Sequence, residues 1–153
     1  MKVTIRTALA ADSKPIARIL AQCSVDPSFC LQDQKFQQQN VRQYLGEISQ
    51  ASGQEVLVAV TPTGLVVGYL HQVELGMMYL PGPELLVSQL FVSPAHQGEE
   101  VERQLLEHVE RYAKTSSAVQ IRVLGDTMAE HTDLAVFSGY EQIAPCSWKK
   151  GTL

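Results

Sequence analysis

Residues 88–114 read SQLFVSPAHQGEEVERQLLEHVERYAK and combine the end of a strand, a short loop and a long helix. The run 84–92 is rich in Val, Leu and Phe, which favours a strand, and Ser93-Pro94 then turns the chain. From 98 to 114 the apolar residues recur at helical spacing, which predicts a helix with one face toward a core: Val101, Leu105, Val109 and Tyr112. Because this helix follows the strand so closely, its free backbone N–H groups and positive dipole end form a site suited to an anion.

Strands and helices are also expected on both sides of this stretch. Alternation of apolar and polar residues predicts a strand over 3–7, and Pro62-Thr63-Gly64 predicts a hairpin between two apolar runs. The expected strands are 3–7, 56–61, 65–75, 84–92 and 118–124, with one or two more over 140–149. The expected helices are 13–23, 35–50, 98–114 and 127–137. No repeat or linker interrupts this order, so the sequence predicts one mixed α/β domain over 1–153.

The composition narrows the classes of partner. The chain has 153 residues, of which 45% are hydrophobic and 18% charged, as in folded globular domains. Twelve Lys and Arg against sixteen Asp and Glu give a net charge of −4, which argues against a nucleic-acid partner. No apolar run reaches the roughly 18 residues of a membrane span, and no signal-peptide core is present. Three cysteines and four histidines show no metal-ligand spacing, so we expect a cytoplasmic protein without a metal site.

Four segments together resemble the GNAT superfamily of N-acetyltransferases. They are VTIRTALAADSKPIARIL (3–20), VLVAVTPTGLVVGYLHQVEL (56–75), residues 88–114, and HTDLAVFSGYEQIAPCSWKK (131–150). The resemblance covers nearly the whole chain, and the third segment is the specific one. It implies a single-domain α+β fold with a mixed, mostly antiparallel central sheet flanked by helices. It also implies that the strands 84–92 and 118–124 part near Val92 and Val123 to hold a cofactor arm.

The resemblance implies a binding site for acetyl-CoA along the strand and loop of the third segment. The strand would supply backbone groups to the pantetheine arm, and the loop and first helical turn would hold the diphosphate. The implied residues are Leu90, Phe91 and Val92 for the arm and Gln97, Gly98, Glu99, Glu100, Val101, Glu102 and Arg103 for the diphosphate.

This loop departs from the family pattern, which is Arg or Gln, Gly, any residue, Gly, any residue, and Gly or Ala. Gln97 and Gly98 match, but Glu100 and Glu102 occupy the other two small-residue positions, and Glu99 adds a third carboxylate. A carboxylate about 5 Å from a phosphate charge repels it by roughly 3 kcal/mol at an effective dielectric constant near 20. The same residues stabilise the first turn of the helix by about 0.3–1 kcal/mol each. We therefore expect acetyl-CoA binding to be weakened or lost.

The catalytic groups that the resemblance implies are not evident. A tyrosine is common four residues before the glycine of the last Gly-aromatic turn, where it protonates the leaving thiolate. That glycine is Gly139, the counted position is Ala135, and the nearby Phe137 has no proton to give. Ser88 and Gln89 stand where a base would be, and neither is a base near neutral pH.

The remaining candidate bases lie on predicted strands. We expect His71, Glu74 and Glu84 to be polar residues that face solvent, so no catalytic residue is assigned.

Two loops are candidates for contact with a substrate or partner. In the family, the loop between the first two helices (23–34 here) and the region 76–83 line the acceptor site. The second loop is unusually apolar, and a homodimer contact and a substrate surface are equally consistent with it. Its large side chains, which we expect to be covered by a second subunit or to border a cleft, are Met77, Met78, Tyr79 and Leu80.

Two functions follow from these observations. The first is an acetyl-CoA-dependent N-acetyltransferase, in which the amine of a small molecule or peptide attacks the thioester directly. The second is a degenerate member of the same fold that has lost acetyl-CoA and serves as a ligand-binding or protein-interaction module.

Overall fold

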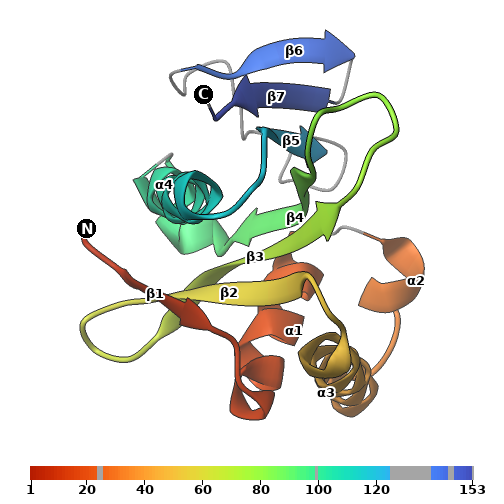
Figure 1. The fold of residues 1–153 in the computed structure, drawn as a ribbon. Coiled ribbons are helices and arrows are strands. Elements are labelled where there is room, and N and C mark those ends of the chain that lie inside the picture. Colours follow the sequence, from red (N-terminus) through yellow and green to blue (C-terminus); the bar gives the residue numbers. More distant parts are fainter. Residues whose placement is uncertain (24–25, 99, 125–138, 145–146, 153) are drawn as a thin grey trace.

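The computed structural model of the protein describes residues 1–153 apart from 24–25, 99, 125–138, 145–146 and 153 (Figure 1). The strands are β1 (Thr4–Thr7), β2 (Gln54–Val60), β3 (Val66–Leu75), β4 (Glu84–Val92), β5 (Gln120–Leu124), β6 (Glu141–Ala144) and β7 (Ser147–Gly151). The helices are α1 (Ser13–Gln22), α2 (Pro27–Cys30), α3 (Gln34–Gln50) and α4 (Glu100–Thr115), with 3₁₀ turns at Ala10–Asp12 and Pro94–His96. None of the described helices is long and apolar enough to cross a membrane.

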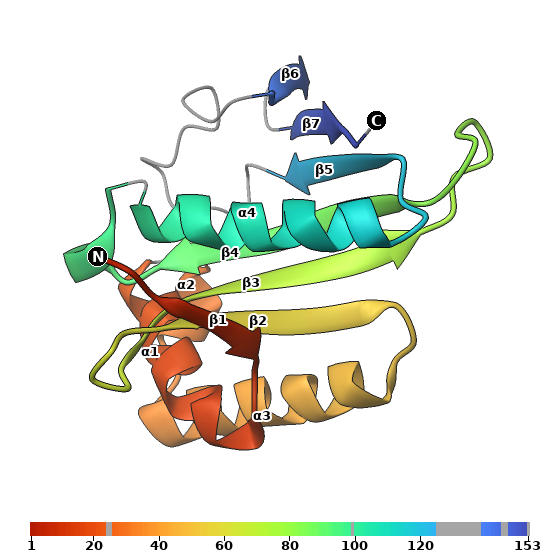
Figure 2. The ribbon, with the colours of Figure 1, turned by 60° about the vertical axis from the view of Figure 1, so that its left-hand side comes forward.

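The strands form one sheet in the order β1-β2-β3-β4-β5-β7-β6. Only β4 and β5 pair in parallel among the described strands, and the other neighbours are antiparallel. Helices α1 and α3 cover one face of the sheet and α4 covers the other (Figure 2). The predicted fold, a mixed and mostly antiparallel sheet flanked by helices, is confirmed.

Each face of the sheet carries its own core because side chains alternate along a strand. In β2, Leu57 and Ala59 pack toward α4, whereas Val56 and Val58 pack toward α1 and α3. The stripe predicted for α4 is confirmed at Val101, Leu105 and Val109 but is wrong at Tyr112, which is 41% exposed. At 3.6 residues per turn the buried face continues through Ala113, four residues after Val109.

The loop predicted over 23–34 contains a short helix. Asp26 is the N-cap of α2, because its Oδ1 accepts hydrogen bonds from the backbone N–H groups of Ser28 (2.8 Å) and Phe29 (3.4 Å). Asp33 caps α3 in the same way, with its Oδ1 2.8 Å from the N of Phe36. The helix predicted over 127–137, with Ala135 and Phe137, lies outside the described residues.

The β4–β5 ladder is short. Glu84–Val87 pair with Gln120–Val123, after which the described part of β5 has only Leu124 left while β4 continues to Val92 beside β3. Among the described residues the pairing of β4 with β5 ends at Val87 and Val123. The residues that follow Leu124 lie outside the described part of the chain, so the parting near Val92 and Val123 stays a prediction.

Ser88 comes directly after Val87. The β3–β4 register pairs Gln72 with Val87 and His71 with Gln89, so it skips Ser88, which forms a β-bulge.

Candidate active site

A cavity of about 430 Å³ lies between helices α1–α3 and the face of the sheet that they cover. Its walls include Ile16 and Leu20 of α1, Asp26 and Phe29 at α2, and the side of α3 that carries Asn40, Tyr44 and Glu47. Its floor is the sheet, through Val56 of β2, Tyr69 and His71 of β3 and Gln89 of β4. The predicted acceptor loop 23–34 thus contributes to this cavity through Asp26 and Phe29.

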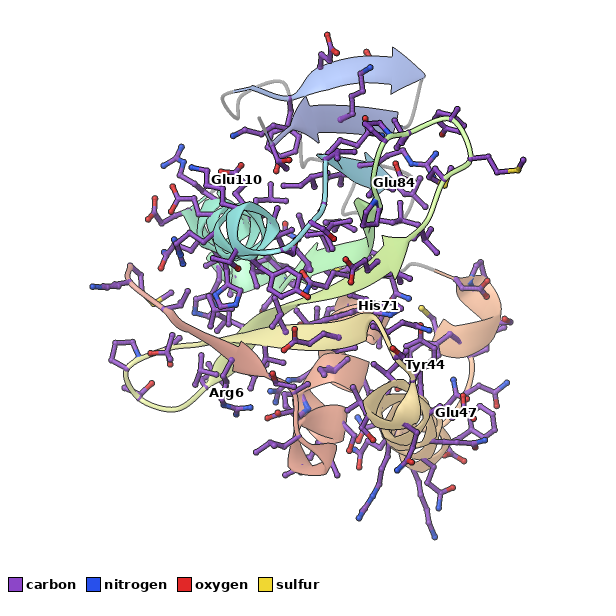
Figure 3. All side chains as sticks on the ribbon, in the orientation of Figure 1. Arg6, Tyr44, Glu47, His71, Glu84 and Glu110 are labelled. Atoms are coloured by element: carbon purple, nitrogen blue, oxygen red, sulfur yellow. The ribbon has the colours of Figure 1, made fainter. Side chains whose placement is uncertain are left out.

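His71 is the central polar group of the floor, and Figure 3 shows it on the sheet next to Tyr44 of α3. Its Nε2 lies 3.2 Å from Gln54 Oε1, so Nε2–H donates to that oxygen and Nδ1 is left as an acceptor. Nδ1 lies 2.8 Å from Ser88 Oγ and 3.1 Å from Tyr44 Oη. Burial, with 4% of the residue exposed, lowers the pKa of His71. The imidazole is therefore neutral near pH 7 and holds a lone pair toward two hydroxyl groups.

Two sequence predictions for polar strand residues are wrong. His71 does not face solvent, because α3 lies over β3 and the Tyr44 ring stands edge-on to the imidazole at 5.6 Å. Glu84 does not face solvent either, because Arg122 on β5 reaches its carboxylate at 2.8 Å and leaves the side chain 0% exposed. Glu74 is half-buried.

Two tyrosines close the polar part of the cavity. Tyr69 Oη donates to Gln89 Oε1 at 2.9 Å, and its burial raises the pKa of Tyr69 well above the ordinary value. Burial, with a contribution from the charge of Glu47, raises the pKa of Tyr44. Both phenols are protonated near neutral pH, so each can donate a hydrogen bond or pass on a proton. Tyr44, Tyr69 and Gln54 were not identified from the sequence; the signal available was the spacing of Tyr69 and His71 on one face of a strand.

The end of β4, which the resemblance implies as the pantetheine site, is held in place by buried side chains. Leu90, Phe91 and Val92 are each at most 2% exposed, so only their backbone could meet a ligand. The Val92 carbonyl already accepts from Gln97 Nε2 at 3.0 Å and lies 3.6 Å from Cys23 Sγ.

Gly68 on β3 lies behind this strand end. A Cβ at Gly68 would lie 3.2 Å from the Phe91 carbonyl oxygen, so a larger residue there would have to push this strand end away by a few tenths of an ångström.

The loop implied as the diphosphate site combines matching and conflicting features. Gly98 has φ +137°, a conformation that favours glycine, and open space on the side where a Cβ would be. Glu100 is exposed and points along the helix to Arg103 (3.3 Å) and Gln104 (3.2 Å). Backbone geometry and the N-terminus of α4 therefore fit a diphosphate, while Glu100 adds a negative charge beside it.

The expectation that Glu99, Glu100 and Glu102 all surround the diphosphate position is wrong for Glu102. Glu102 is 3% exposed and belongs to the buried side of α4, because Val101 and Glu102 both turn inward at the first helical turn. Glu99 lies outside the described residues.

The apolar loop after β3 projects beyond the sheet (Figure 2). Met78 is fully exposed and Tyr79 is 71% exposed, and neither lines the cavity above His71. No group of three or more His, Cys, Asp or Glu residues in the described part of the chain could hold a metal ion.

No family model and no curated protein match this sequence. Solved structures do match. An acetyltransferase of the GNAT family from Staphylococcus aureus is 12% identical, with a TM-score of 0.68 over 99% of this chain and 100% of the other. The PaiA N-acetyltransferase of Thermoplasma acidophilum, solved with coenzyme A, is 13% identical, with a TM-score of 0.66 over 99% of both chains.

A third match is described as a transcriptional regulator of Bacillus halodurans. It is 20% identical, with a TM-score of 0.69 over 88% of this chain and 85% of the other. At such identities the similarity is one of fold, and it extends over nearly the full length of each protein. This chain therefore has the fold of the GNAT N-acetyltransferases.

Proposed function

We propose that this protein transfers an acetyl group from acetyl-CoA to an amine that binds in the cavity above His71. The observation that carries this proposal is a neutral, buried imidazole on the cavity floor, close to Val87, the last residue of β4 that pairs with the described part of β5. The fold of the coenzyme A complex from T. acidophilum supports acetyl-CoA as the donor. The donor would lie along the end of β4 and at the N-terminus of α4, where Gly98 leaves the backbone accessible.

His71 supplies the proton acceptor that the reaction needs. An aliphatic amine has a pKa near 10 and is protonated at neutral pH, and only its neutral form is a nucleophile. The Tyr44 hydroxyl, 3.1 Å from Nδ1, can pass its proton to His71 while it accepts one from the amine. Gln54 Oε1 holds the opposite nitrogen and keeps Nδ1 directed at this path.

The cavity favours a small cationic amine. Its volume is in the range of sites for small molecules, of order 300–1,000 Å³. Asp26 and Glu47 line it, and its described lining includes no Lys or Arg, so its charge attracts an ammonium group. Phe29, Leu20 and Ile16 would pack against an apolar body, and the amino end of a short peptide fits the same description.

Calorimetric titration with acetyl-CoA at low salt, followed by a thiol-release assay with a panel of amines, tests this proposal. We expect binding, release of coenzyme A that depends on the amine, and a loss of about 10²–10⁴-fold in kcat/KM for His71→Gln. His108→Gln is the matched control, because His108 lies on α4, away from the cavity. Absence of acetyl-CoA binding would refute the proposal.

One observation favours the second candidate, a binding module without catalysis. Glu100 and Glu102 replace small residues at the diphosphate position, and Glu100 is exposed there. If acetyl-CoA does not bind while a small amine does, the cavity serves as a ligand site in a non-catalytic protein.

A further inference from the structure

Gln89 of β4 brings hydrogen-bond donors to the floor of the cavity. Its Oε1 accepts a hydrogen bond from Tyr69 Oη at 2.9 Å, which leaves both N–H groups of Nε2 available. Gln89 is half-buried and lines the cavity, and its Nε2 has no hydrogen-bond partner among the described residues. An amide nitrogen withdrawn from bulk water costs free energy unless it finds an acceptor. Gln89 Nε2 is therefore suited to donate to an acceptor atom of a bound substrate.

Tyr69 fixes the orientation of this amide. Tyr69 is 2% exposed, and the centre of its ring lies 5.8 Å from that of Phe91, so its hydroxyl has a fixed place on the floor. Burial raises the pKa of Tyr69, so the phenol keeps its proton and is the donor to Gln89 Oε1. Because Oε1 is engaged in this way, Nε2 is the end of the amide that a ligand meets.

Gln89 also lies beside the proposed base. The β3–β4 register pairs Gln89 with His71, and both residues line the cavity. Directly opposed residues of antiparallel strands have Cβ atoms about 4.5–5.5 Å apart, on the same face of the sheet. The proton acceptor, Nδ1 of His71 with the Tyr44 hydroxyl, is thus a neighbour of the donor Nε2. A substrate that meets both groups carries an acceptor atom close to its amine, as on the neighbouring carbon atom.

The charge of the cavity disfavours a free carboxylate as that acceptor. Asp26 and Glu47 line the cavity, and hydrogen bonds from Ser28 lower the pKa of Asp26, which is therefore ionised at neutral pH. The described lining includes no Lys or Arg that would pair with a carboxylate of the substrate. A neutral oxygen next to the amine fits this charge better than the carboxylate of a free amino acid does.

The hydrogen bonds on the floor favour a carbonyl oxygen over a hydroxyl. A carbonyl only accepts, whereas a hydroxyl brings a donor that needs an acceptor of its own. The acceptors next to Gln89 Nε2 already have donors: Gln89 Oε1 pairs with Tyr69, and His71 Nδ1 pairs with Ser88 and Tyr44. An amine with a neutral carbonyl on the neighbouring carbon is the amino end of a peptide.

We propose that Gln89 determines specificity by binding the first carbonyl group of a peptide, so that the acceptor of this protein is a peptide α-amine. This inference rests on the proposed function for the transfer itself and names the class of amine. The α-nitrogen lies at Tyr44 and His71, and the first carbonyl oxygen accepts from Gln89 Nε2. The first side chain packs against the apolar residues of the wall, which are Ile16, Leu20 and Phe29.

The strength of the base agrees with this class of amine. Burial lowers the pKa of His71, which makes the imidazole a weak base. The α-amine of a peptide has a pKa of about 7.7–8.0, against about 10.4 for a lysine side chain, so its neutral fraction at pH 7 is roughly several hundred-fold larger. One proton of the α-ammonium goes to the Tyr44–His71 pair, the nitrogen–carbon bond forms, the carbon–sulfur bond breaks, and a second proton leaves on the thiol.

Leucinamide and three analogues test this inference without acetyl-CoA. Leucinamide has the α-amine, the carbonyl and the apolar side chain of a first peptide residue. Isoamylamine is the same molecule without the carboxamide, leucine carries a carboxylate in its place, and leucinol carries a hydroxyl. In calorimetric titrations of the full chain at pH 7, we expect leucinamide to bind at least about tenfold more tightly than each analogue, as one added hydrogen bond allows.

Two substitutions of Gln89 test its role in this preference. Gln89→Met removes both donors at similar side-chain length, and it should weaken leucinamide binding about tenfold while isoamylamine binding is unchanged. Gln89→Glu keeps an acceptor for Tyr69 but has no donor at neutral pH, so it should lose the same preference, which separates the lost hydrogen bond from a folding defect. Gln38→Met should keep the preference, because Gln38 is a half-buried glutamine of α3 that does not line the cavity.

The same amines with acetyl-CoA complete the test. At equal concentrations of neutral amine, we expect kcat/KM to favour leucinamide over isoamylamine by at least about tenfold. The carbonyl stays bound before and during the transfer, so Gln89→Met should raise KM for leucinamide and leave kcat nearly unchanged. A variant that had merely lost its structure would lose kcat for both amines.

The inference and the proposed function fail in different ways. Equal binding of leucinamide and isoamylamine overturns the inference, as does a Gln89→Met variant that keeps the preference. Leucine or leucinol binding as tightly as leucinamide overturns the assignment to peptides. If leucinamide is preferred in binding but no amine is acetylated, the peptide site stands and the proposed function fails. If all four amines are acetylated equally well, the proposed function stands and the inference fails.

Discussion

Arg122 Nη2 on β5 lies 2.8 Å from Oε1 of Glu84 on β4, and the Glu84 side chain is 0% exposed. Gln120 Nε2 donates to the other carboxylate oxygen at 2.8 Å. This ion pair joins the two parallel strands at the end where they are paired, four residues before the bulge at Ser88. The same two strands therefore have a strongly paired end and an end where the described β5 no longer accompanies β4.

Breaking this ion pair should destabilise the protein strongly. Arg122→Met leaves the buried Glu84 carboxylate without its cation, which costs about 3 kcal/mol and lowers Tm by roughly 6–12 °C. Thermal melting measures the change. Arg103→Met is the control, because its pair with Glu100 is about half exposed and contributes less than about 1 kcal/mol. Equal losses in the two variants would contradict the assignment of a buried pair.

The stability of the protein should fall as the solution is acidified through the range in which free histidine titrates. Burial lowers the pKa of His71 below its usual 6.5, so the unfolded chain takes up the proton first. The contribution to stability is present above the unfolded pKa near 6.5 and is lost as pH falls toward the lower folded value. Urea unfolding at a series of pH values measures this slope, and His71→Gln should reduce it.

His108 adds a second contribution of the same sign. Its pKa is lowered by burial and then by the neighbouring charge of Arg111. His108→Gln should therefore remove part of the slope that remains in His71→Gln. A slope that is unchanged in the double variant would show that other groups carry the pH dependence.

Removing the carboxylates of Glu100 and Glu102 in the first turn of α4 should strengthen acetyl-CoA binding. Glu100→Gly together with Glu102→Ala removes two charges near the expected diphosphate and should raise affinity at least about tenfold, the equivalent of about 1.4 kcal/mol. Titration calorimetry measures the gain. The part due to exposed Glu100 should shrink with salt, whereas the part due to buried Glu102 should persist. No gain in the double variant would contradict the charge argument.

The exposed pair Met78 and Tyr79 should contact a second copy of the chain. Their side chains are exposed and lie apart from the cavity, which leaves the subunit contact as the expectation to test. We expect the wild type to sediment as a dimer and Met78→Ser with Tyr79→Ser to sediment as a folded monomer. Leu31→Ser is the control, because Leu31 is 87% exposed but lies at the end of α2. A monomeric wild type would refute this expectation.

The sequence alone determined the order of the described strands and of helices α1, α3 and α4 and, through residues 88–114, the fold. Local patterns sufficed because the spacing of apolar residues and the turn residues fix the backbone over a few neighbouring positions. As predicted, β3 ends at Leu75 and β4 spans Glu84–Val92. For the candidate cavity, the sequence predicted only that the loop 23–34 would line an acceptor site.

The polar centre of the site was decided by the tertiary structure. The sequence predicted that His71 and Glu84 face solvent, because polar side chains on a strand usually do. Whether they are buried depends on what lies over the strand: Tyr44 of α3 covers His71, and Arg122 of a distant strand covers Glu84. The bulge at Ser88 lets two successive residues, Ser88 and Gln89, face the side of β4 that carries His71 and the cavity. No local pattern encodes such a slip in register between strands.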